Sequence, residues 1–199
     1  MISTKEMTKL ENQSVEKGIS KLKLMENAGY GLYQNLKHDF ELDNKIILII
    51  CGHGNNGGDG FVLARYLIEN QYNVKILFLG DENKLKKESK YNYFMLQDKY
   101  SKYFTRLTNN IDTSEIIVDA MLGTGVNGKI REPYSSVIDL INKTNAIKIT
   151  VDIPTGLNPD TGKILDKVVN SDKIYTFHDA KLGLKDYMDK VIIVDIGIK

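Results

Sequence analysis

The sequence predicts an α/β protein built on a doubly wound, mainly parallel sheet that is flanked by helices and preceded by two extra N-terminal helices. Two observations lead to this class. Short β-branched runs alternate with stretches of helical periodicity along the chain. Several of these runs are apolar on both faces, as strands of a helix-covered parallel sheet must be. Since no internal repeat or linker interrupts the pattern, we expect one domain over residues 1–199.

The helices and strands are expected in a regular order. Two helices come first, at about 3–17, ended by Gly18, and at about 21–37. Later helices are expected at 56–70 and at 133–143, the second with Pro133 in its first turn. Strands are expected at 45–51, 74–79, 115–121, 147–153, 173–177 and 190–196.

Composition excludes several classes of protein. The chain has 199 residues, is 42% hydrophobic and 27% charged, and carries a formal net charge of +1, so no strong field attracts nucleic acid or an anionic membrane. The longest apolar run, Ile46–Cys51, is far shorter than the roughly 20 residues that span a bilayer, and no signal peptide begins the chain. The only cysteine, Cys51, is expected to be a small core residue, which fits a cytoplasmic protein.

The segment Lys84–Lys102 is rich in lysine, and six aromatic residues lie between Tyr91 and Phe104. A nucleic-acid interface would need both kinds of side chain on one exposed surface. The helical period instead favours aromatic residues that pack inward and lysines that face water. We therefore expect no nucleic-acid partner.

Three predicted strand ends carry more polar chemistry than a connection requires. They are GHGNNGGDG (52–60), VDAMLGTGVNGK (118–129) and VDIPTG (151–156). In an open α/β sheet, ligands bind outside the carboxyl ends of the strands. These three loops are therefore the expected site.

The first loop contains the G-x-G-x-x-G pattern of dinucleotide folds, whose glycines allow the backbone to approach a ligand closely. Asp59, however, is expected in the first helical turn, where its charge would oppose a pyrophosphate. The acid that usually follows the second strand has only a late counterpart, Asp81. Asparagine and aspartate oxygens suit hydroxyl groups, amides or a hard cation instead.

Two aspartates, Asp119 and Asp152, end neighbouring β-rich runs and are expected at one rim of the sheet. If both stayed ionised and close, they would repel each other, and a bound cation or one protonated acid would relieve this. Asn56, Asp119 and Thr155 offer oxygen atoms that suit an alkali or alkaline-earth ion. Asp152 then remains as the candidate for acid–base chemistry.

These residues resemble the NAD(P)H-hydrate epimerases, also called YjeF N-terminal domains. The motifs occur in the order typical of the family and span nearly the whole chain: LMENAG (24–29), GHGNNGGDGFVLAR (52–65), VDAMLGTG (118–125), VDIPTGLNPDTG (151–162) and TFHDAKLGL (176–184). The resemblance implies a Rossmann-like domain that interconverts the R and S forms of hydrated NADH or NADPH. It also implies a homodimer and functional coupling to a separate ADP- or ATP-dependent hydratase.

The resemblance also assigns roles to individual residues. Substrate contacts are implied for Asn55, Asn56, Gly57, Gly58, Asp59 and Asp152, and for the loop residues Gly123, Thr124, Gly125, Val126, Asn127, Gly128 and Lys129. A potassium ion is implied at Asn56, Asp119 and Thr155. Two positions depart from the family pattern. His53 stands where proline is common, and Thr155 replaces the usual serine but keeps its hydroxyl group.

Epimerisation at C6 of the hydrated nicotinamide ring requires an acid that can donate and take back one proton. Asp152 is the first candidate. Lys181 is the second, with a solvated surface lysine as its alternative interpretation. Two other functions stay open at this point: an ordinary NAD-dependent oxidoreductase, and a ligand-sensing or interaction module on the same fold. The preference between hydrated NADH and hydrated NADPH is also open.

Overall fold

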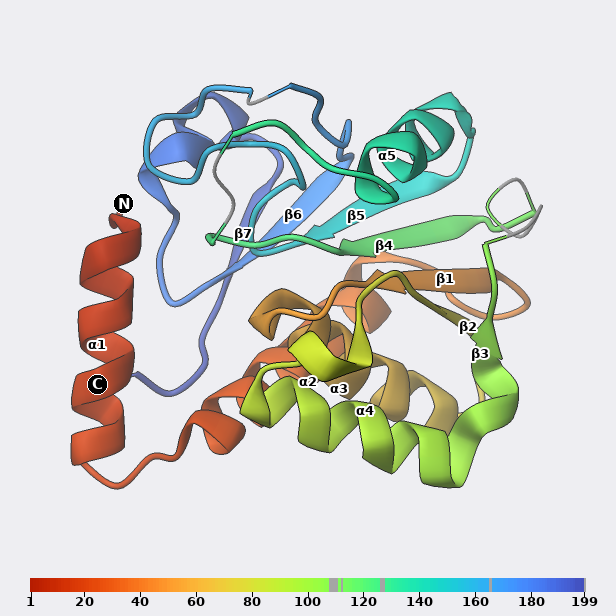
Figure 1. The fold of residues 1–199 in the computed structure, drawn as a ribbon, viewed down its shortest axis with the longest axis horizontal. Coiled ribbons are helices and arrows are strands. Elements are labelled where there is room, and N and C mark those ends of the chain that lie inside the picture. Colours follow the sequence, from red (N-terminus) through yellow and green to blue (C-terminus); the bar gives the residue numbers. More distant parts are fainter. Residues whose placement is uncertain (108–110, 112, 126–127, 165, 199) are drawn as a thin grey trace.

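The computed structural model describes residues 1–107, 111, 113–125, 128–164 and 166–198 (Figure 1). Within these residues, one seven-stranded sheet has the order β3-β2-β1-β4-β5-β6-β7, and all pairings between neighbouring strands are parallel. The strands are β1 (Ile46–Cys51), β2 (Asn73–Phe78), β3 (Phe104–Thr105), β4 (Ile116–Ala120), β5 (Ile147–Val151), β6 (Lys173–Phe177) and β7 (Val191–Val194). The predicted doubly wound α/β class is therefore confirmed.

The main helices are α1 (Thr4–Glu16), α2 (Lys21–Asp39), α3 (Asn55–Glu69), α4 (Lys87–Tyr100) and α5 (Tyr134–Lys143). Short 3₁₀ helices follow β2, α4 and β6 at η1 (Glu82–Lys84), η2 (Ser101–Tyr103) and η3 (Leu182–Tyr187). Helices α2, α3 and α4 lie on one side of the sheet and α5 on the other, as Figure 1 shows. No helix in the described parts of the chain is long and apolar enough to cross a membrane.

The sheet is buried on both faces because successive strand residues point to opposite layers. In β1, Ile47 and Ile49 join the core formed with α2, α3 and α4. Leu48 and Ile50 join the smaller core that α5 covers. This alternation explains why the central strands are continuously apolar in the sequence, without a polar face.

Most elements lie within two residues of their predicted bounds, and the two N-terminal helices are present. One strand was missed, because β3 consists only of Phe104 and Thr105 and is too short to show a period. The prediction for α4 was wrong in part. Its lysines are exposed and Tyr93 is buried as expected, but the side chains of Tyr91 and Phe94 are exposed.

The N-terminal segment is attached to the segment that follows β6. The backbone of Ile2 forms a parallel bridge with Lys181, donating to Ala180 O and accepting from Leu182 N. Thr4 donates from its amide and its hydroxyl group to the two carboxylate oxygens of Asp160, at 2.7 and 2.6 Å. A capping box between Ser3 and Glu6 then begins α1. Helix α1 is thus held against the segments that follow β5 and β6.

Candidate active site

The turn after β1 places the start of α3 close to the loop that follows β4. Gly52 donates its amide to Ala120 O, and Gly57 packs on the backbone of Gly52 so closely that a Cβ atom would collide with its carbonyl group. Glycine is therefore required for this approach. Asn55 is exposed at the first residue of α3, whereas Asn56, Gly57, Gly58 and Asp59 are buried.

Asp59 lies one turn further along α3 than the sequence predicted. Helix α3 begins at Asn55 and has no acidic residue in its first turn, so Asp59 lies in the second turn. Burial raises the pKa of Asp59 well above its ordinary value, and the nearby charges of Asp152 and Glu11 raise it further. The prediction that Asp59 lies in the first helical turn is therefore wrong.

Asp119 joins β4 to the loop that follows β5. Its Oδ1 accepts from the Thr155 hydroxyl group at 2.6 Å and from the Met121 amide at 3.2 Å, and its Oδ2 accepts from the Thr155 amide at 2.8 Å. Burial raises the pKa of Asp119 to about 6, while these hydrogen bonds act in the opposite direction. Thr155 accepts in turn from the Leu122 amide at 3.0 Å. Thr155 is fully buried, and so is the methyl group that distinguishes it from the serine usual in the family.

Asn56 is buried, and neither Oδ1 nor Nδ2 of its amide has a hydrogen-bond partner in the described part of the chain. A buried amide without partners costs roughly 1–3 kcal/mol. This cost marks Asn56 as a candidate ligand-binding residue. Gly123, from the loop after β4, packs against it: a Cβ atom there would lie 3.5 Å from Asn56 Oδ1. The Asn56 oxygen, the Asp119 carboxylate and the Thr155 hydroxyl group are hard donors that suit a potassium ion.

Four further residues of the loop after β4 are open to solvent. Thr124, Gly125, Gly128 and Lys129 are exposed. The other two residues of the implied substrate-binding loop, Val126 and Asn127, lie outside the described residues.

Asp152 follows β5 directly and forms an ion pair with Lys181, with 2.6 Å between Asp152 Oδ1 and Lys181 Nζ. The same oxygen accepts from the Thr176 hydroxyl group at 2.9 Å. Lys181 Nζ also donates to Thr176 Oγ1 at 3.1 Å and to Phe177 O at 2.9 Å, so its three protons have three acceptors. Lys181 is only 1% exposed, and the alternative interpretation as a solvated surface lysine is therefore wrong.

The backbone at Asp152 is strained. Its φ is +64°, in the left-handed region that non-glycine residues rarely adopt. His178, which follows β6 on the neighbouring strand, has the same φ of +64°. Strain of this kind costs on the order of 1–3 kcal/mol and is concentrated at functional sites, where the surrounding structure maintains it. Here it aims the Asp152 carboxylate at Lys181.

A cavity of about 70 Å³ adjoins the ion pair and is lined by Asn55, Asp59, Phe177 and Glu11, among others. Phe177 connects the cavity to the ion pair, because its carbonyl oxygen accepts from Lys181 and the residue also lines the cavity. Glu11 comes from α1 and was not among the predicted site residues. No motif surrounds it in the sequence, and only the tertiary structure places it here.

Three other residues singled out in the sequence are less central. His53 is half-buried, and its Nδ1 lies 3.4 Å from the hydroxyl oxygen of Tyr134. Asp81 is exposed and caps η1, accepting from the Asn83 amide. Cys51 is buried in the core as predicted, and burial raises the pKa of its thiol well above the ordinary value, so it is no nucleophile.

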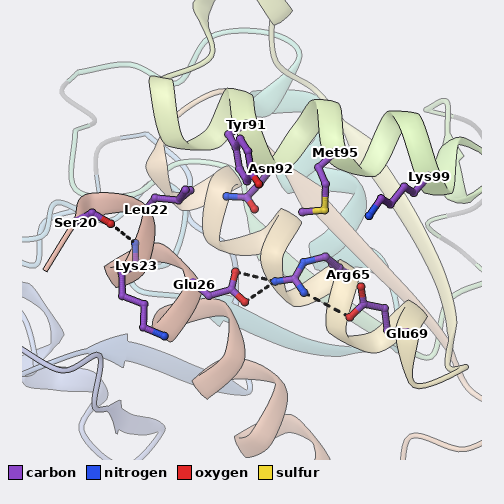
Figure 2. A pocket seen from close by; sticks show the side chains of 10 residues that line it. All are labelled: Ser20, Leu22, Lys23, Glu26, Arg65, Glu69, Tyr91, Asn92, Met95 and Lys99. Carbon is purple, nitrogen blue, oxygen red and sulfur yellow. Dashed lines mark hydrogen bonds and ion pairs between the residues drawn. The ribbon is translucent and has the colours of Figure 1, made fainter.

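A larger open pocket, of about 460 Å³, lies between α2, α3 and α4 and contains none of the predicted site residues. Figure 2 shows its centre, where the Arg65 guanidinium group binds both carboxylate oxygens of Glu26 and also contacts Glu69. This arrangement joins helices and leaves the arginine charge neutralised. The polar strand ends lie elsewhere.

Comparisons with known proteins identify the family of the chain. Residues 21–183 match the family model described as YjeF-related protein N-terminus. An NAD(P)H-hydrate epimerase of Nitrosopumilus maritimus is 40% identical over 99% of this chain and 95% of its own length. A bifunctional NAD(P)H-hydrate repair enzyme, Nnr, of Archaeoglobus fulgidus is also 40% identical, but the chain spans only 41% of it. The crystal structure of the yeast protein YNL200c shares the fold, with a TM-score of 0.84 and 24% identity over 97% of this chain and 86% of that one.

Proposed function

The chain belongs to the family of the YjeF-related protein N-terminus, and from this membership we infer that it is an NAD(P)H-hydrate epimerase. It is an isomerase that interconverts the R and S forms of hydrated NADH and NADPH at C6 of the nicotinamide ring, in nicotinamide nucleotide repair. The observation that carries this conclusion is the 40% identity to an epimerase along nearly the full length of both chains.

Inversion at C6 requires that one bond at this carbon breaks and forms again. In one route, the C6 hydroxyl group takes a proton and leaves as water, and water then adds to the other face of the ring and returns the proton. In the other route, the hydroxyl group loses its proton as the C6–N1 bond opens, and N1 adds back to the opposite face of the new carbonyl group. Both routes balance without an oxidant, and both need one group that exchanges a proton.

Asp152 remains our candidate for this group, supported by its place at the strand end and by the neighbours that hold it. Thr176 and Lys181 fix the orientation of the carboxylate through one oxygen, Oδ1, which leaves Oδ2 for the substrate. Lys181 is our second candidate, since a buried ammonium group beside a carboxylate can stabilise charge that develops during proton exchange. Asn55–Asp59 and the loop 123–129 are proposed to bind the nucleotide.

We propose potassium as the ion held by Asn56, Asp119 and Thr155. The support is the buried Asn56 amide without partners and the oxygen chemistry of all three side chains. Bound there, the ion would balance the buried Asp119 charge and fix the loops after β4 and β5 relative to α3. We further propose that the protein is a cytoplasmic homodimer and that it works with a separate ADP- or ATP-dependent hydratase.

The experiment that tests the function uses hydrated NADH as a mixture of its two epimers. An S-specific hydratase is added until its reaction stalls, this protein is then added, and recovery of the NADH absorbance is followed. We expect the remaining R epimer to be consumed faster than by its spontaneous interconversion. Folded protein that leaves the stalled reaction unchanged in the presence of potassium would contradict the epimerase function and favour the interaction module.

A further inference from the structure

The N-terminal helix α1 lies entirely outside the residues that match the family model, which begin at Lys21. The structure nevertheless holds α1 at the site. Ile2 bridges the backbone on both sides of Lys181, and Thr4 binds Asp160 through two hydrogen bonds. Few side chains of α1 are buried, and Met7 and Ser14 are its buried residues. Because α1 buries so few side chains, the hydrogen bonds of Ile2 and Thr4 contribute much of what holds it in place.

Glu11 is the acidic residue that α1 brings to the site. It lies on the wall of the 70 Å³ cavity, which Asp59 of α3 and Phe177 of β6 also line. Phe177 O binds the Lys181 ammonium group, and the Phe177 amide lies 3.5 Å from Asp152 Oδ1. The buried Lys181 thus pairs directly with Asp152, and two further carboxyl groups, those of Glu11 and Asp59, line the cavity that Phe177 also lines.

We propose that Glu11 is a positioning residue for epimerisation, which acts through Asp152, Lys181 and Asp59 by setting the charge balance around the buried lysine. The proposal rests on the proposed function for its kinetic consequences. Lys181 alone balances one carboxylate, and the carboxyl group of Glu11 adds a second negative charge on the side of the cavity. This charge holds protons on its neighbours more tightly.

The electrostatics agree with this geometry. Burial raises the pKa of Glu11, the Asp152 charge raises it further, and the charges of Lys181 and Lys21 lower it. Glu11 in turn is one of the groups that raise the pKa of Asp59. The other charged residues that line the cavity are Lys21 of α2 and Glu88 of α4.

The test compares Glu11→Gln with the wild type, using Glu16→Gln as a matched control on an exposed position of the same helix. Removing the charge at Glu11 lowers the proton affinity of its neighbours, so we expect the pH–rate profile for epimerisation to move to lower pH, by about half a pH unit or more. Glu11→Asp keeps the charge and should restore most of the wild-type profile. Glu16→Gln should leave the profile unchanged.

A second readout does not depend on turnover. Carboxyl-carbon NMR of the ligand-free protein follows the titration of Asp59, whose midpoint should fall in Glu11→Gln and stay unchanged in Glu16→Gln. If wild-type protein shows no turnover, the proposed function fails, and the Asp59 midpoint still tests the coupling. If wild-type protein turns over but Glu11→Gln has the same profile and the same Asp59 midpoint, the role of Glu11 is overturned.

Discussion

At the scale of single residues, the conformation of Asp152 provides a clean test of its role. Asp152→Asn removes the charge and the exchangeable proton, while asparagine tolerates the observed φ of +64° better than most residues. We expect the variant to keep its fold and to lose about 10²–10⁴-fold in kcat, the range typical of a lost acid–base group. Steady-state kinetics and far-UV circular dichroism measure both.

The control for this variant is Asp43→Asn, which makes the same chemical change at an exposed position before β1. It should retain wild-type kcat. Full activity in Asp152→Asn would exclude Asp152 as the group that exchanges the proton and would leave Lys181 as the candidate.

Asn56 permits a test of the ion site that needs no substrate. If potassium binds the folded protein alone, it stabilises the wild type by mass action, by roughly 2.7 kcal/mol at 100 times the dissociation constant. Asn56→Ala removes the buried amide without partners, and we expect its melting temperature to be independent of potassium. Thermal melts in potassium and in a large organic cation at equal ionic strength make the comparison. A wild-type melting temperature that ignores potassium would contradict the site.

Only those site residues that lie within a sequence motif could be predicted from the sequence. Asp119, Asp152 and Thr155 stand at predicted strand ends, and the parallel sheet brings such ends together by geometry. The strained φ of Asp152 and the burial of Lys181 were not predictable, since both depend on how the loop after β6 folds back. Glu11 was missed because its role depends on the attachment of α1 to residues some 150 or more positions away.

At the scale of elements, the pairing of α2 with α3 depends on a polar cluster. Glu26 of α2 accepts from the Arg65 guanidinium group and from the Tyr66 hydroxyl group, at 2.6 and 2.5 Å through Oε1. Burial raises the pKa of Glu26, but these hydrogen bonds together outweigh it, so that the net pKa is lowered from 4.5. Figure 2 shows the contact between Glu26 and Arg65 in this cluster.

A lowered pKa in the folded protein means that the Glu26 carboxylate stabilises the fold above pH 4.5, and that this contribution disappears as the pH falls through the lowered value. We expect Glu26→Gln to reduce the free energy of unfolding at pH 7 by about 1–2 kcal/mol, discounted for partial exposure. The difference from wild type should shrink and then vanish as the pH falls through the lowered pKa of Glu26. Urea unfolding at several pH values measures it, and Glu41→Gln, at an exposed position, should show no such loss. A loss of unfolding free energy that is larger in acid than at pH 7 would contradict this prediction.

The elements themselves were largely predictable. Strands buried on both faces give unbroken β-branched runs, and helices on the sheet show a 3.6-residue period. Predictions failed where the local pattern is ambiguous. Strand β3 is two residues long, and α4 has aromatic residues on both its buried and its exposed faces, as Tyr93 and Tyr91 show.

At the scale of the whole molecule, stability is expected to be uneven. The middle of the sheet, β1 and β4, is buried on both faces, whereas α1 buries few side chains. Amide hydrogen exchange should therefore be slowest in β1 and β4 and should approach the global free energy of unfolding there. Exchange in α1 should be faster by at least tenfold, through a local opening. Mass spectrometry of peptides from both regions provides the measurement, and equal protection of α1 and β1 would contradict the expectation.

The bridge between Ile2 and the backbone around Lys181 also has a consequence for biosynthesis. A ribosome makes the N-terminal residues first, but their partners are added some 180 positions later. At about 5–20 residues per second, the first strand-like contact of the chain waits roughly 10–40 s for its counterpart. Until then the strands that have already been made can pair without α1, and the bridge of Ile2 forms only after residues 180–182 have been synthesised.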